Sequence, residues 1–287
     1  TRDSFAKRFE SPVEHAEGDS AARLQALVSP FVLRRVKEDV VADLPEKIED
    51  TVMAQLTGEQ RKLYLANQDR IAQQVQHREA SEFKKDKLKV LAELTKLRQI
   101  CCDPRLHYED YKAGSAKLDT CMELVHGALD GGHRILLFSQ FTGMLDIISK
   151  RLAKEDIAFL KLTGASSKES RAKMVAQFQA GEVPVFLISL KAGGVGLNLT
   201  AADVVIHYDP WWNVAAQDQA TDRAHRIGQQ HTVTVYKLIA KDTIEERIMQ
   251  MQESKRDLVN SVLGGDGISS ALFTREDVLA LLGGDGR

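Results

Sequence analysis

The segment SLKAGGVGLNLTAADVVIHYDP, residues 189–210, indicates the fold class of this chain. It joins two short apolar runs, PVFLIS ending at Ser189 and DVVIHY ending at Tyr208, through a turn that contains three glycines. Because glycine has no Cβ, such a turn lets backbone N–H groups approach a phosphate or a sugar closely. Taken alone the turn is weak support for a nucleotide site, since a simple tight turn is equally compatible with it. The glycines are Gly193, Gly194 and Gly196.

Short apolar runs alternate with amphipathic segments on both sides of this turn. The pattern predicts strands at 134–139, 159–163, 184–189, 203–208 and 232–239, and helices at 142–154, 167–180, 213–224 and 242–262. Strands that alternate with helices are typical of an α/β fold, a parallel sheet with helices on both faces. Right-handed crossovers place the strand-end loops on one edge, where such folds bind ligands. Asn198 and Asp203 are expected beside that edge, with Lys191 adding a positive charge.

The first third of the chain is predicted to be mostly helical. Alternating apolar residues favour one strand over 48–56, and two long helices are expected over 57–101, with Thr57 and Gln60 spaced as a capping box. In the second helix one apolar face consists of Leu88, Leu91, Leu94 and Leu97. The other face carries the cations Lys84, Lys85, Lys87, Lys89, Lys96 and Arg98. A solvated helix face is the favoured interpretation, and a phosphate-contacting strip is the alternative.

The last segment, GGDGISSALFTREDVLALLGGDGR, is rich in glycine around one short helix. Thr274 is placed to cap that helix, and Asp277 falls at its third position. The sequence predicts a loosely attached extension. At the other end no initiator Met is present, which indicates a piece of a longer protein.

Composition excludes several classes of protein. Lys plus Arg is 39 against 41 Asp plus Glu, a net charge of −2, so the chain is not uniformly basic, although a local basic strip is possible in principle. No apolar run reaches about 18 residues and the first residues are polar, so neither a membrane-spanning helix nor a signal segment is expected. Cys101, Cys102 and Cys121 form no C-x-x-C pair, so we expect neither a metal site nor a disulfide framework.

A second informative segment is QATDRAHRIGQ, residues 219–229. If the segment is helical, Gln219, Asp222, Arg223 and Arg226 lie on one stripe. A solvated charged helix is the plain alternative. Two arginines with a glutamine are more typical of phosphate capture, because a guanidinium is always charged and offers five rigid donors. Phosphate loops of the form G-x-x-x-x-G-K-[ST] and an Asp-Glu-x-His motif after a strand are both missing, so the chain is not expected to hydrolyse a nucleotide alone.

These segments together resemble the Swi/Snf-type ATPases of helicase superfamily 2. GGVGLNLTAADVVIHYDPWWN, QATDRAHRIGQ and VTVYKLIAKDTIEERI resemble motifs V and VI and their flank, and RILLFSQFTGMLDII resembles motif IV. LKLTGASSKESRAKMVAQFQ resembles the next DNA-facing motif, while FVLRRVKEDVVADLPEK and KLRQICCDP resemble the lobe-joining segment and the helical protrusion. The resemblance covers roughly residues 22–262 and is specific, because seven signatures occur in the family's order.

The resemblance implies a second RecA-like lobe of a two-lobe motor. Its expected divisions are the lobe-joining segment with one strand (1–56), the helical protrusion (57–110), the RecA-like lobe (111–262) and a C-terminal helical extension (263–287). Mg²⁺ and the triphosphate of ATP would be held by the first lobe. Partners implied are the backbone of double-stranded DNA, that first lobe, and a DNA-bound protein complex whose identity the sequence does not give.

Site residues follow from matching motif positions. Arg226 matches the arginine finger, Arg223 its companion, and Gln219 opens motif VI. The ATP-edge positions are Gly194, Gly196, Asn198 and Asp222. The DNA-backbone positions are Ser139, Gln140, Thr163, Gly164, Ser189, Lys191 and Trp212. For Trp211 and Trp212, packing between the lobe and its extension is the simpler interpretation.

Two other functions compete with a motor lobe. A stand-alone RecA-like module with degenerate chemistry is disfavoured by the retained Gln219, Arg223 and Arg226, and an ordinary doubly wound nucleotide-binding enzyme is disfavoured because G-x-G-x-x-G does not follow the first strand. The expected location is the cytoplasm and nucleoid of a bacterium, which the spare architecture favours, or the nucleus of a eukaryote. Secretion is not expected.

Overall fold

The structure is a computed structural model that describes residues 44–77, 80–193, 196–252 and 275–283, together with Arg23, Ala26 and Leu27. Its strands are β1 (Lys47–Gln55), β2 (Ile135–Ser139), β3 (Phe159–Leu162), β4 (Val185–Ser189), β5 (Val204–His207) and β6 (Val233–Lys241). Its helices are α5 (Gly58–Gln76), α6 (Ala80–Cys102), η2 (Pro104–Leu106), α7 (Ala116–Asp130), α8 (Thr142–Lys154), α9 (Lys168–Gln179), α10 (Leu190–Gly193), α11 (Val214–Thr221) and α13 (Arg275–Leu281), plus a helix over residues 244–252.

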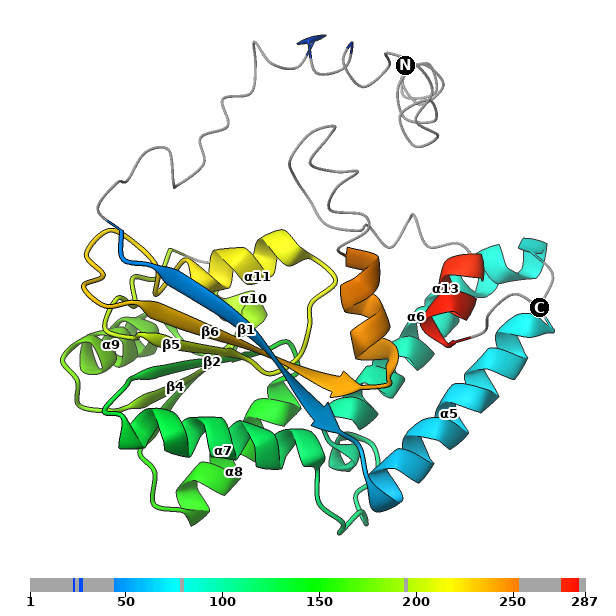
Figure 1. Cartoon of the computed structure of the whole chain (residues 1–287), viewed down its shortest axis with the longest axis horizontal. Coiled ribbons are helices and arrows are strands. Elements are labelled where there is room, and N and C mark those ends of the chain that lie inside the picture. Colours follow the sequence, from blue (N-terminus) through cyan, green and yellow to red (C-terminus); the bar gives the residue numbers. More distant parts are fainter. Residues whose placement is uncertain are drawn as a thin grey trace.

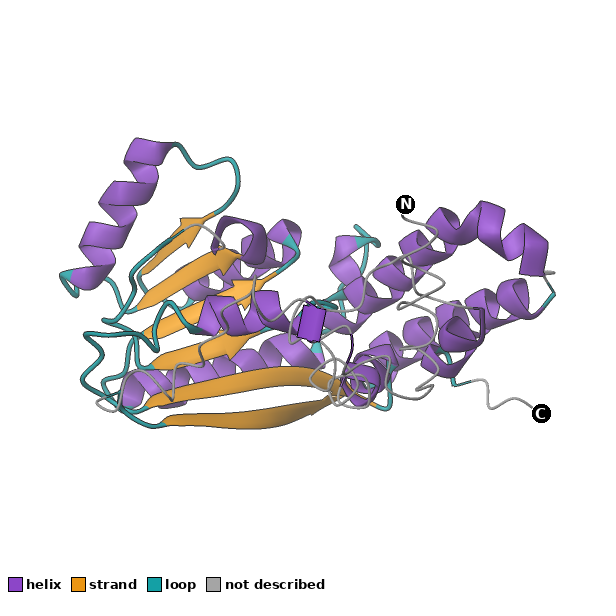
Figure 2. Ribbon diagram, turned by 90° about the horizontal axis from the view of Figure 1, so that it is seen from above, coloured by secondary structure: helices purple, strands orange, loops and turns teal. Residues whose placement is uncertain are grey.

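The described strands form one six-stranded sheet in the order β1-β6-β5-β2-β4-β3, and every pairing is parallel (Figures 1 and 2). This confirms the predicted fold class. All five residues of β2 and of β4 are buried, as expected for central strands of a parallel sheet covered on both faces. The strand predicted near the start of the chain, β1, pairs with β6 along its whole length and completes one edge.

Each face of the sheet is covered by its own set of helices. Helices α7 and α8 pack on one face, where Val125 and Ile148 meet the odd-numbered side chains of β2. On the other face, α9, α10 and α11 cover the alternate side chains, with Phe178 packed against Phe186 at a ring separation of 5.4 Å. Successive side chains of a strand point to opposite faces of the sheet, so each fully apolar strand contributes side chains to the cores on both faces.

A third core joins the hairpin of α5 and α6 to the carboxyl end of β6 and to the last helices. Tyr64 of α5 is buried, and its hydroxyl oxygen accepts a hydrogen bond of 2.7 Å from the backbone N–H of Ile244. Helix α13 packs on α5 with Val278 and Leu281 fully buried. The described part of the C-terminal extension is therefore docked, and the prediction of a loose attachment is wrong for residues 275–283.

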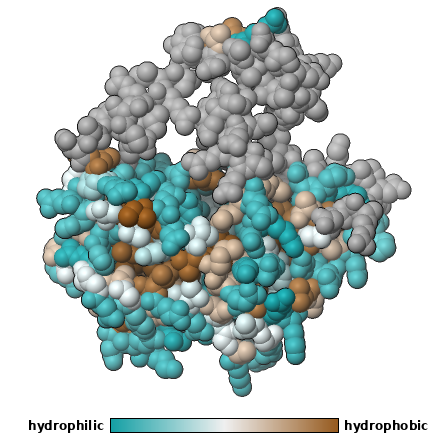
Figure 3. Space-filling view, in the orientation of Figure 1, coloured by the Kyte–Doolittle hydropathy of each residue, from teal (hydrophilic) through white to brown (hydrophobic). Residues whose placement is uncertain are grey.

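The edge strand β1 is the least covered part of the sheet. Ile48 and Met53 are 46% and 39% exposed, and Figure 3 shows hydrophobic side chains on the face of the molecule that carries β1 in Figure 1. Along this edge Glu49 bridges Lys47 and Lys237 at 2.7 and 2.6 Å. Burial opposes ionisation of Glu49, but the hydrogen bonds and charges of both lysines outweigh it and lower its pKa to about 2.

Several local predictions were wrong. Thr57 is the N-cap of α5 but makes no capping hydrogen bond, because Gln60 instead donates to the backbone oxygens of Ile100 and Cys101 and so joins α5 to α6. Leu88 is 82% exposed, so the apolar face of α6 begins only where α5 and the sheet lie against it. Helix α7 was not predicted, although Ser115 caps it. The predicted cap Thr274 and the segments 21–35 and 253–262 lie outside the residues described here, apart from Arg23, Ala26 and Leu27.

None of the helices within the described residues is both long and apolar enough to span a membrane.

Candidate functional site

The arginine segment is a turn rather than a continuous helix. Helix α11 is N-capped by Asn213, whose Oδ1 accepts from the N–H of Ala216 at 3.1 Å, and it ends at Thr221 with Asp222 as its C-cap. Arg223 and Arg226 lie in the turn that follows, so they share no helical stripe with Gln219, which is exposed on the helix. The predicted stripe was wrong.

The structure brings the Gly-rich segment and the arginine turn together. The backbone N–H of Leu199 donates to the backbone oxygen of Arg223 at 2.9 Å, although the two residues lie far apart in sequence. Leu199 and Ala224 are buried in the same core, whereas Gly196 and Asn198 remain exposed beside it. The side-by-side placement of these loops is what a shared nucleotide edge requires.

The two arginines of this turn differ in their exposure. Arg223 is buried, with 8% exposed, and Arg226 is exposed. Burial lowers the pKa of Arg223, and the positive charge of Arg226 lowers it further, against the opposing effect of Asp222. Because the positive charge of Arg226 disfavours the charge of Arg223, an anion that contacts both guanidinium groups would relieve their repulsion.

Gly196 has a φ of +47° and open space where a Cβ would stand. Glycine is therefore favoured at this position by the left-handed backbone conformation, and not because another part of this chain lies close to it. Gly228 has a φ of +100° and ends the arginine turn in the same way. Gly194 lies outside the described residues, and Lys191 lies in the short helix α10.

The prediction that these residues share the carboxyl edge of the sheet was wrong. Asp203 lies at the amino ends of the strands, where its Oδ1 accepts from the N–H of Arg134 at 3.0 Å and its Oδ2 contacts His133 Nδ1 at 2.8 Å. All strands are parallel, so after each strand the chain must return to the amino ends of the sheet before the next strand begins. Asp203, just before β5, and the arginine turn, before β6, therefore both lie at that end. His225, which hydrogen-bonds the backbone oxygen of Pro45 just before β1, fixes the turn at this end.

The carboxyl edge carries the residues predicted to contact DNA, but not all face outward. Ser139 and Ser189, the last residues of β2 and β4, are buried. The hydroxyl of Ser139 donates to Asp209 Oδ1 at 2.5 Å. Both serines are thus buried in this structure, and their assignment to DNA-backbone positions stays a prediction.

After β3 the chain turns at half-buried Thr163 and exposed Gly164. The backbone N–H of Thr163 donates to Ser166 Oγ at 3.2 Å, and the N–H of Ser166 donates to the backbone oxygen of Thr163 at 3.1 Å. Gly164 has nothing within 4 Å of the place a Cβ would take, so its backbone is open to a large partner. Ser167 then caps α9 through the N–H of Ser170.

Two further residues at this edge, Asp209 and Arg98, were missed or misassigned by sequence reasoning. Asp209, directly after β5, is buried and holds both Ser139 and Gln140. Arg98, predicted on the polar face of α6, is 1% exposed and lies over the rings of Phe141 and Trp212. Trp212 also packs against the third core, as the simpler interpretation of this tryptophan predicted. An aspartate at the end of a buried strand was the available signal for Asp209.

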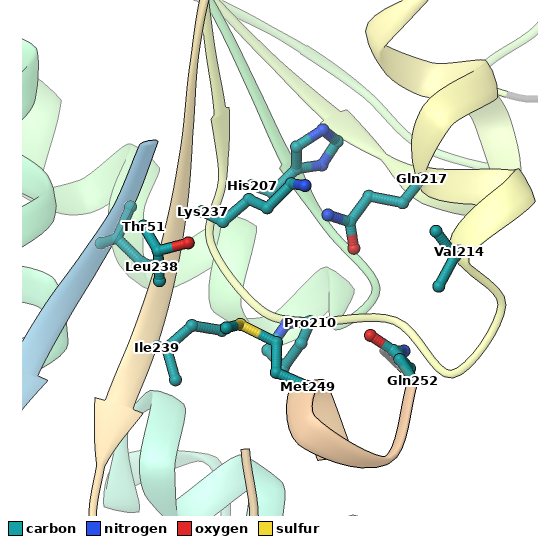
Figure 4. Close-up of a pocket in the computed structure, with 10 residues that line it drawn as sticks. All are labelled: Thr51, His207, Pro210, Val214, Gln217, Lys237, Leu238, Ile239, Met249 and Gln252. Carbon is teal, nitrogen blue, oxygen red and sulfur yellow. The ribbon is translucent and has the colours of Figure 1, made fainter. Parts of the chain in front are cut away.

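A small cavity of about 90 Å³ lies between β6, α11 and the helix over residues 244–252. In Figure 4 the side chains of His207, Lys237 and Gln217 lie at one end and those of Pro210, Met249 and Gln252 at the other. His207 is buried, hydrogen-bonds Thr221 Oγ1 at 2.8 Å and stacks on Phe138. Burial, with a smaller contribution from Lys237, lowers its pKa to about 3, so this imidazole is neutral at pH 7.

Among the described residues no cluster of three or more His, Cys, Asp or Glu side chains is arranged to hold a metal ion. The three cysteines are buried free thiols, and burial raises the pKa of Cys121 to about 12.

Comparison with known proteins identifies the family. Residues 116–228 match the helicase conserved C-terminal domain, and residues 1–106 match the SNF2-related domain. The C-terminal domain of the SWI2/SNF2 ATPase of Sulfolobus solfataricus is 31% identical with a TM-score of 0.66, and the alignment covers 82% of this chain and 98% of that one. The chain belongs to the SWI2/SNF2 family.

Two further relatives of this SWI2/SNF2 chain are longer than the chain itself. The ATPase core of the Sulfolobus solfataricus protein in complex with double-stranded DNA has a TM-score of 0.69 at 34% identity, covering 98% of this chain and 60% of that chain. A protein of Mycoplasma pneumoniae, named as an uncharacterized ATP-dependent helicase, is 39% identical over 278 residues, 96% of this chain. The chain spans only 26–30% of the length of the first curated relatives that it matches. The RecA-like fold predicted from the resemblance is confirmed by these structural neighbours.

Proposed function

We propose that this chain is the second motor lobe of an ATP-dependent translocase on double-stranded DNA, which remodels DNA-bound protein complexes. The observation that carries the proposal is the arginine turn, in which exposed Arg226 and buried Arg223 lie beside the Gly-rich segment. Related ATP-dependent helicases and a SWI2/SNF2 core solved with duplex DNA support the same activity.

ATP, when bound between the two lobes, supplies the phosphoryl group that is transferred to water. In the proposal Arg226 stabilises negative charge on that group as the lobes close, and Arg223 holds the same charge from a fixed, buried position. Gln219 and Asp222 flank the turn, while Gly196 and Asn198, with Gly194 by motif position, line the nucleotide edge. Mg²⁺ would be held by the first lobe, since the described residues offer no carboxylate cluster for it.

DNA would lie across the carboxyl edge of the sheet. The turn of Thr163 and Gly164 and the segment that carries Lys191 would contact phosphates, and Gln140 and Trp212 would support this edge from within. Backbone contacts carry no sequence information, so they suit a motor that steps along any duplex. Because only this edge must attract phosphate, a net charge of −2 does not oppose it.

The test compares phosphate release by the full-length protein and by this chain, each with and without duplex DNA. We expect DNA-stimulated turnover from the full-length protein and none from this chain, because the first lobe supplies the triphosphate and magnesium groups. Robust turnover by this chain alone would overturn the proposal that it needs a partner lobe. DNA binding by the full-length protein without any ATP hydrolysis would instead support a stand-alone binding module.

A further inference from the structure

A buried set of polar side chains connects the helical hairpin to the two loops at the carboxyl edge. We propose that Arg98, Gln140 and Asp209 form a positioning relay through which DNA at this edge controls the arginine turn. The inference rests on the proposed function, because it assigns the residues that couple the two proposed sites. None of the three needs to touch DNA or ATP.

Arg98 joins the hairpin to both loops. It extends from α6, and its guanidinium donates through Nη1 to Gln140 Oε1 at 3.2 Å and through Nη2 to the backbone oxygen of Pro210. The same group lies 5.7 Å from the ring of Phe141 and 5.2 Å from the ring of Trp212. A cation desolvated between two rings gains more from them than an exposed cation does, so this position holds α6 against both loops.

Asp209 holds the other end of the relay. Its buried carboxylate accepts from Ser139 Oγ and Gln140 Nε2, each at 2.5 Å, and from the backbone N–H of Gln140 at 3.3 Å. Three donors from the end of β2 therefore converge on the residue that follows β5. A carboxylate without these donors would be strongly destabilised in this buried position.

Gln140 connects the two charges and can do so in only one orientation. Its amide oxygen faces the guanidinium, while its amide nitrogen donates to Asp209 and, at 3.2 Å, to the backbone oxygen of Pro210. Both N–H groups are thus engaged inside the protein, so Gln140 acts here as a link rather than as a free donor to phosphate.

The loop held by this relay leads into α11, and the arginine turn follows that helix. Trp211 N donates to Gln217 Oε1 at 3.3 Å, Trp211 O accepts from Gln252, and Asn213 caps α11. Helix α11 is only eight residues long and ends at Thr221, immediately before the turn. A shift of the Gln140 loop by bound DNA would therefore move the start of α11 through few intervening contacts, and with it Arg223 and Arg226.

The experiment uses the full-length protein and measures kcat and KM for ATP with and without duplex DNA. Arg98→Met keeps the bulk of the side chain but removes its charge and donors, and Asp209→Asn keeps the shape of the carboxylate but adds an N–H that opposes Gln140. We expect each variant to reduce the ratio of stimulated to unstimulated kcat by about tenfold, while KM for ATP stays close to that of the wild type. Arg98→Lys, which keeps the charge over the rings, should recover part of the stimulation.

A double-mutant cycle separates a relay from two independent packing defects. If Arg98 and Asp209 act through the same link, the double variant should lose no more stimulation than the more damaging single variant. Lys62→Met is the matched control, because Lys62 is an exposed cation on α5, the other helix of the same hairpin. Thermal unfolding of every variant checks the fold, and if Arg98→Met does not fold, Asp209→Asn and Arg98→Lys carry the test.

Failure of the relay and failure of the proposed function give different results. A wild-type protein that shows no DNA-stimulated hydrolysis would overturn the proposed function. A stimulated wild type whose folded Arg98 and Asp209 variants keep the full stimulation ratio, or lose stimulated and unstimulated rates by the same factor, would overturn the relay alone.

Discussion

Arg226 lies exposed on the same turn as a second, buried arginine, Arg223. In the proposed function the side chain of Arg226 contacts ATP only when the first lobe closes against this one. In the full-length protein we expect Arg226→Ala to reduce kcat for ATP hydrolysis by roughly 10³–10⁵ while duplex affinity stays close to that of the wild type. The guanidinium would meet the transferred phosphoryl group only in the closed state, so it stabilises the transition state more than the ground state. Arg226→Lys should rescue little, because an ammonium lacks the planar fork.

Steady-state hydrolysis and DNA binding should be measured on the same preparations. Arg61→Ala, at an exposed position of α5, is the matched control and should behave as the wild type. Near-normal kcat in Arg226→Ala would make Arg226 an ordinary solvated turn residue.

His207 should make this chain sensitive to mild acid. Its pKa of about 3 lies below the ordinary value of 6.5, so the unfolded chain takes up a proton at a higher pH than the folded chain does. Above pH 6.5 this histidine does not change the free energy of unfolding, because it is neutral in both states. As the pH falls from 6.5 toward 3, the free energy of unfolding decreases by about 1.4 kcal/mol per pH unit for this one group. Glu49, whose pKa is lowered from 4.5, decreases the free energy of unfolding only below about pH 4.5. Between pH 6.5 and 5 the decrease therefore comes from histidine rather than from Glu49.

Urea unfolding of this chain at pH 7, 6 and 5 measures the effect. His207→Phe keeps a ring against Phe138 and should give a shallower decline in the free energy of unfolding. An unchanged slope would assign the acid sensitivity to other groups, such as His107, whose pKa is also lowered by burial.

Which residues carry charge at the site was predictable from sequence, but which of them are buried was not. Arg223 and Arg226 stand out because of their type and spacing. Arg98 looked like one more cation on a polar helix face, and only its distant partners, Pro210 and Gln140, explain its burial. The partners of Arg98 lie 42 and 112 residues away and those of Asp209 lie 69 and 70 residues away, so local periodicity does not reveal the relay.

At the level of elements, the strands were predictable because each buried strand is an apolar run with clear ends. Helix α11 ends earlier than its sequence pattern indicates, because the backbone oxygen of Arg223 accepts from Leu199 and the chain turns there. Helix α7 was missed although Leu118, Cys121, Met122 and Val125 have helical spacing and are buried against the sheet. The polar stretch before it concealed its start.

A buried ion pair joins α7 to the helix over residues 244–252. Lys117 Nζ lies 2.5 Å from Glu245 Oε2, neither side chain is exposed, and Glu245 also accepts from the N–H of Ala240. We expect Lys117→Met to lower the free energy of unfolding by about 3–5 kcal/mol, because it leaves a carboxylate buried without its cation.

The double variant Lys117→Met, Glu245→Gln tests that reason. Removing both charges while keeping an acceptor for Ala240 should cost less than the sum of the two single variants, as measured by denaturant unfolding. Additive losses would show that the pair contributes packing only. Lys154→Met, at an exposed position near the end of α8, is the control.

At the scale of the whole molecule, the two proposed sites lie at different ends of the parallel strands. The arginine turn precedes β6, whereas Gln140, Thr163 and Asp209 follow the carboxyl ends of β2, β3 and β5. A single sheet that carries ATP-facing residues at one end and DNA-facing residues at the other can transmit closure at the first to movement at the second. That separation follows from the crossovers and could not be derived from the motifs alone.

This arrangement predicts weak binding of DNA by this chain, without sequence preference and with strong salt dependence. Phosphate contacts release counterions, so affinity should fall steeply between about 50 and 200 mM salt. Lys191→Ala should weaken binding to all duplexes alike and reduce the slope of log K against log salt by about 0.9, whereas Lys154→Ala, at the exposed end of α8 toward the amino ends of the strands, should change neither. Charge reversal at Lys84, Lys85 and Lys87 distinguishes a phosphate strip on α6 from a solvated face, since unchanged affinity supports the latter. Titration of unrelated duplexes at two salt concentrations decides the matter, and a strong preference for one sequence would contradict backbone-only contact.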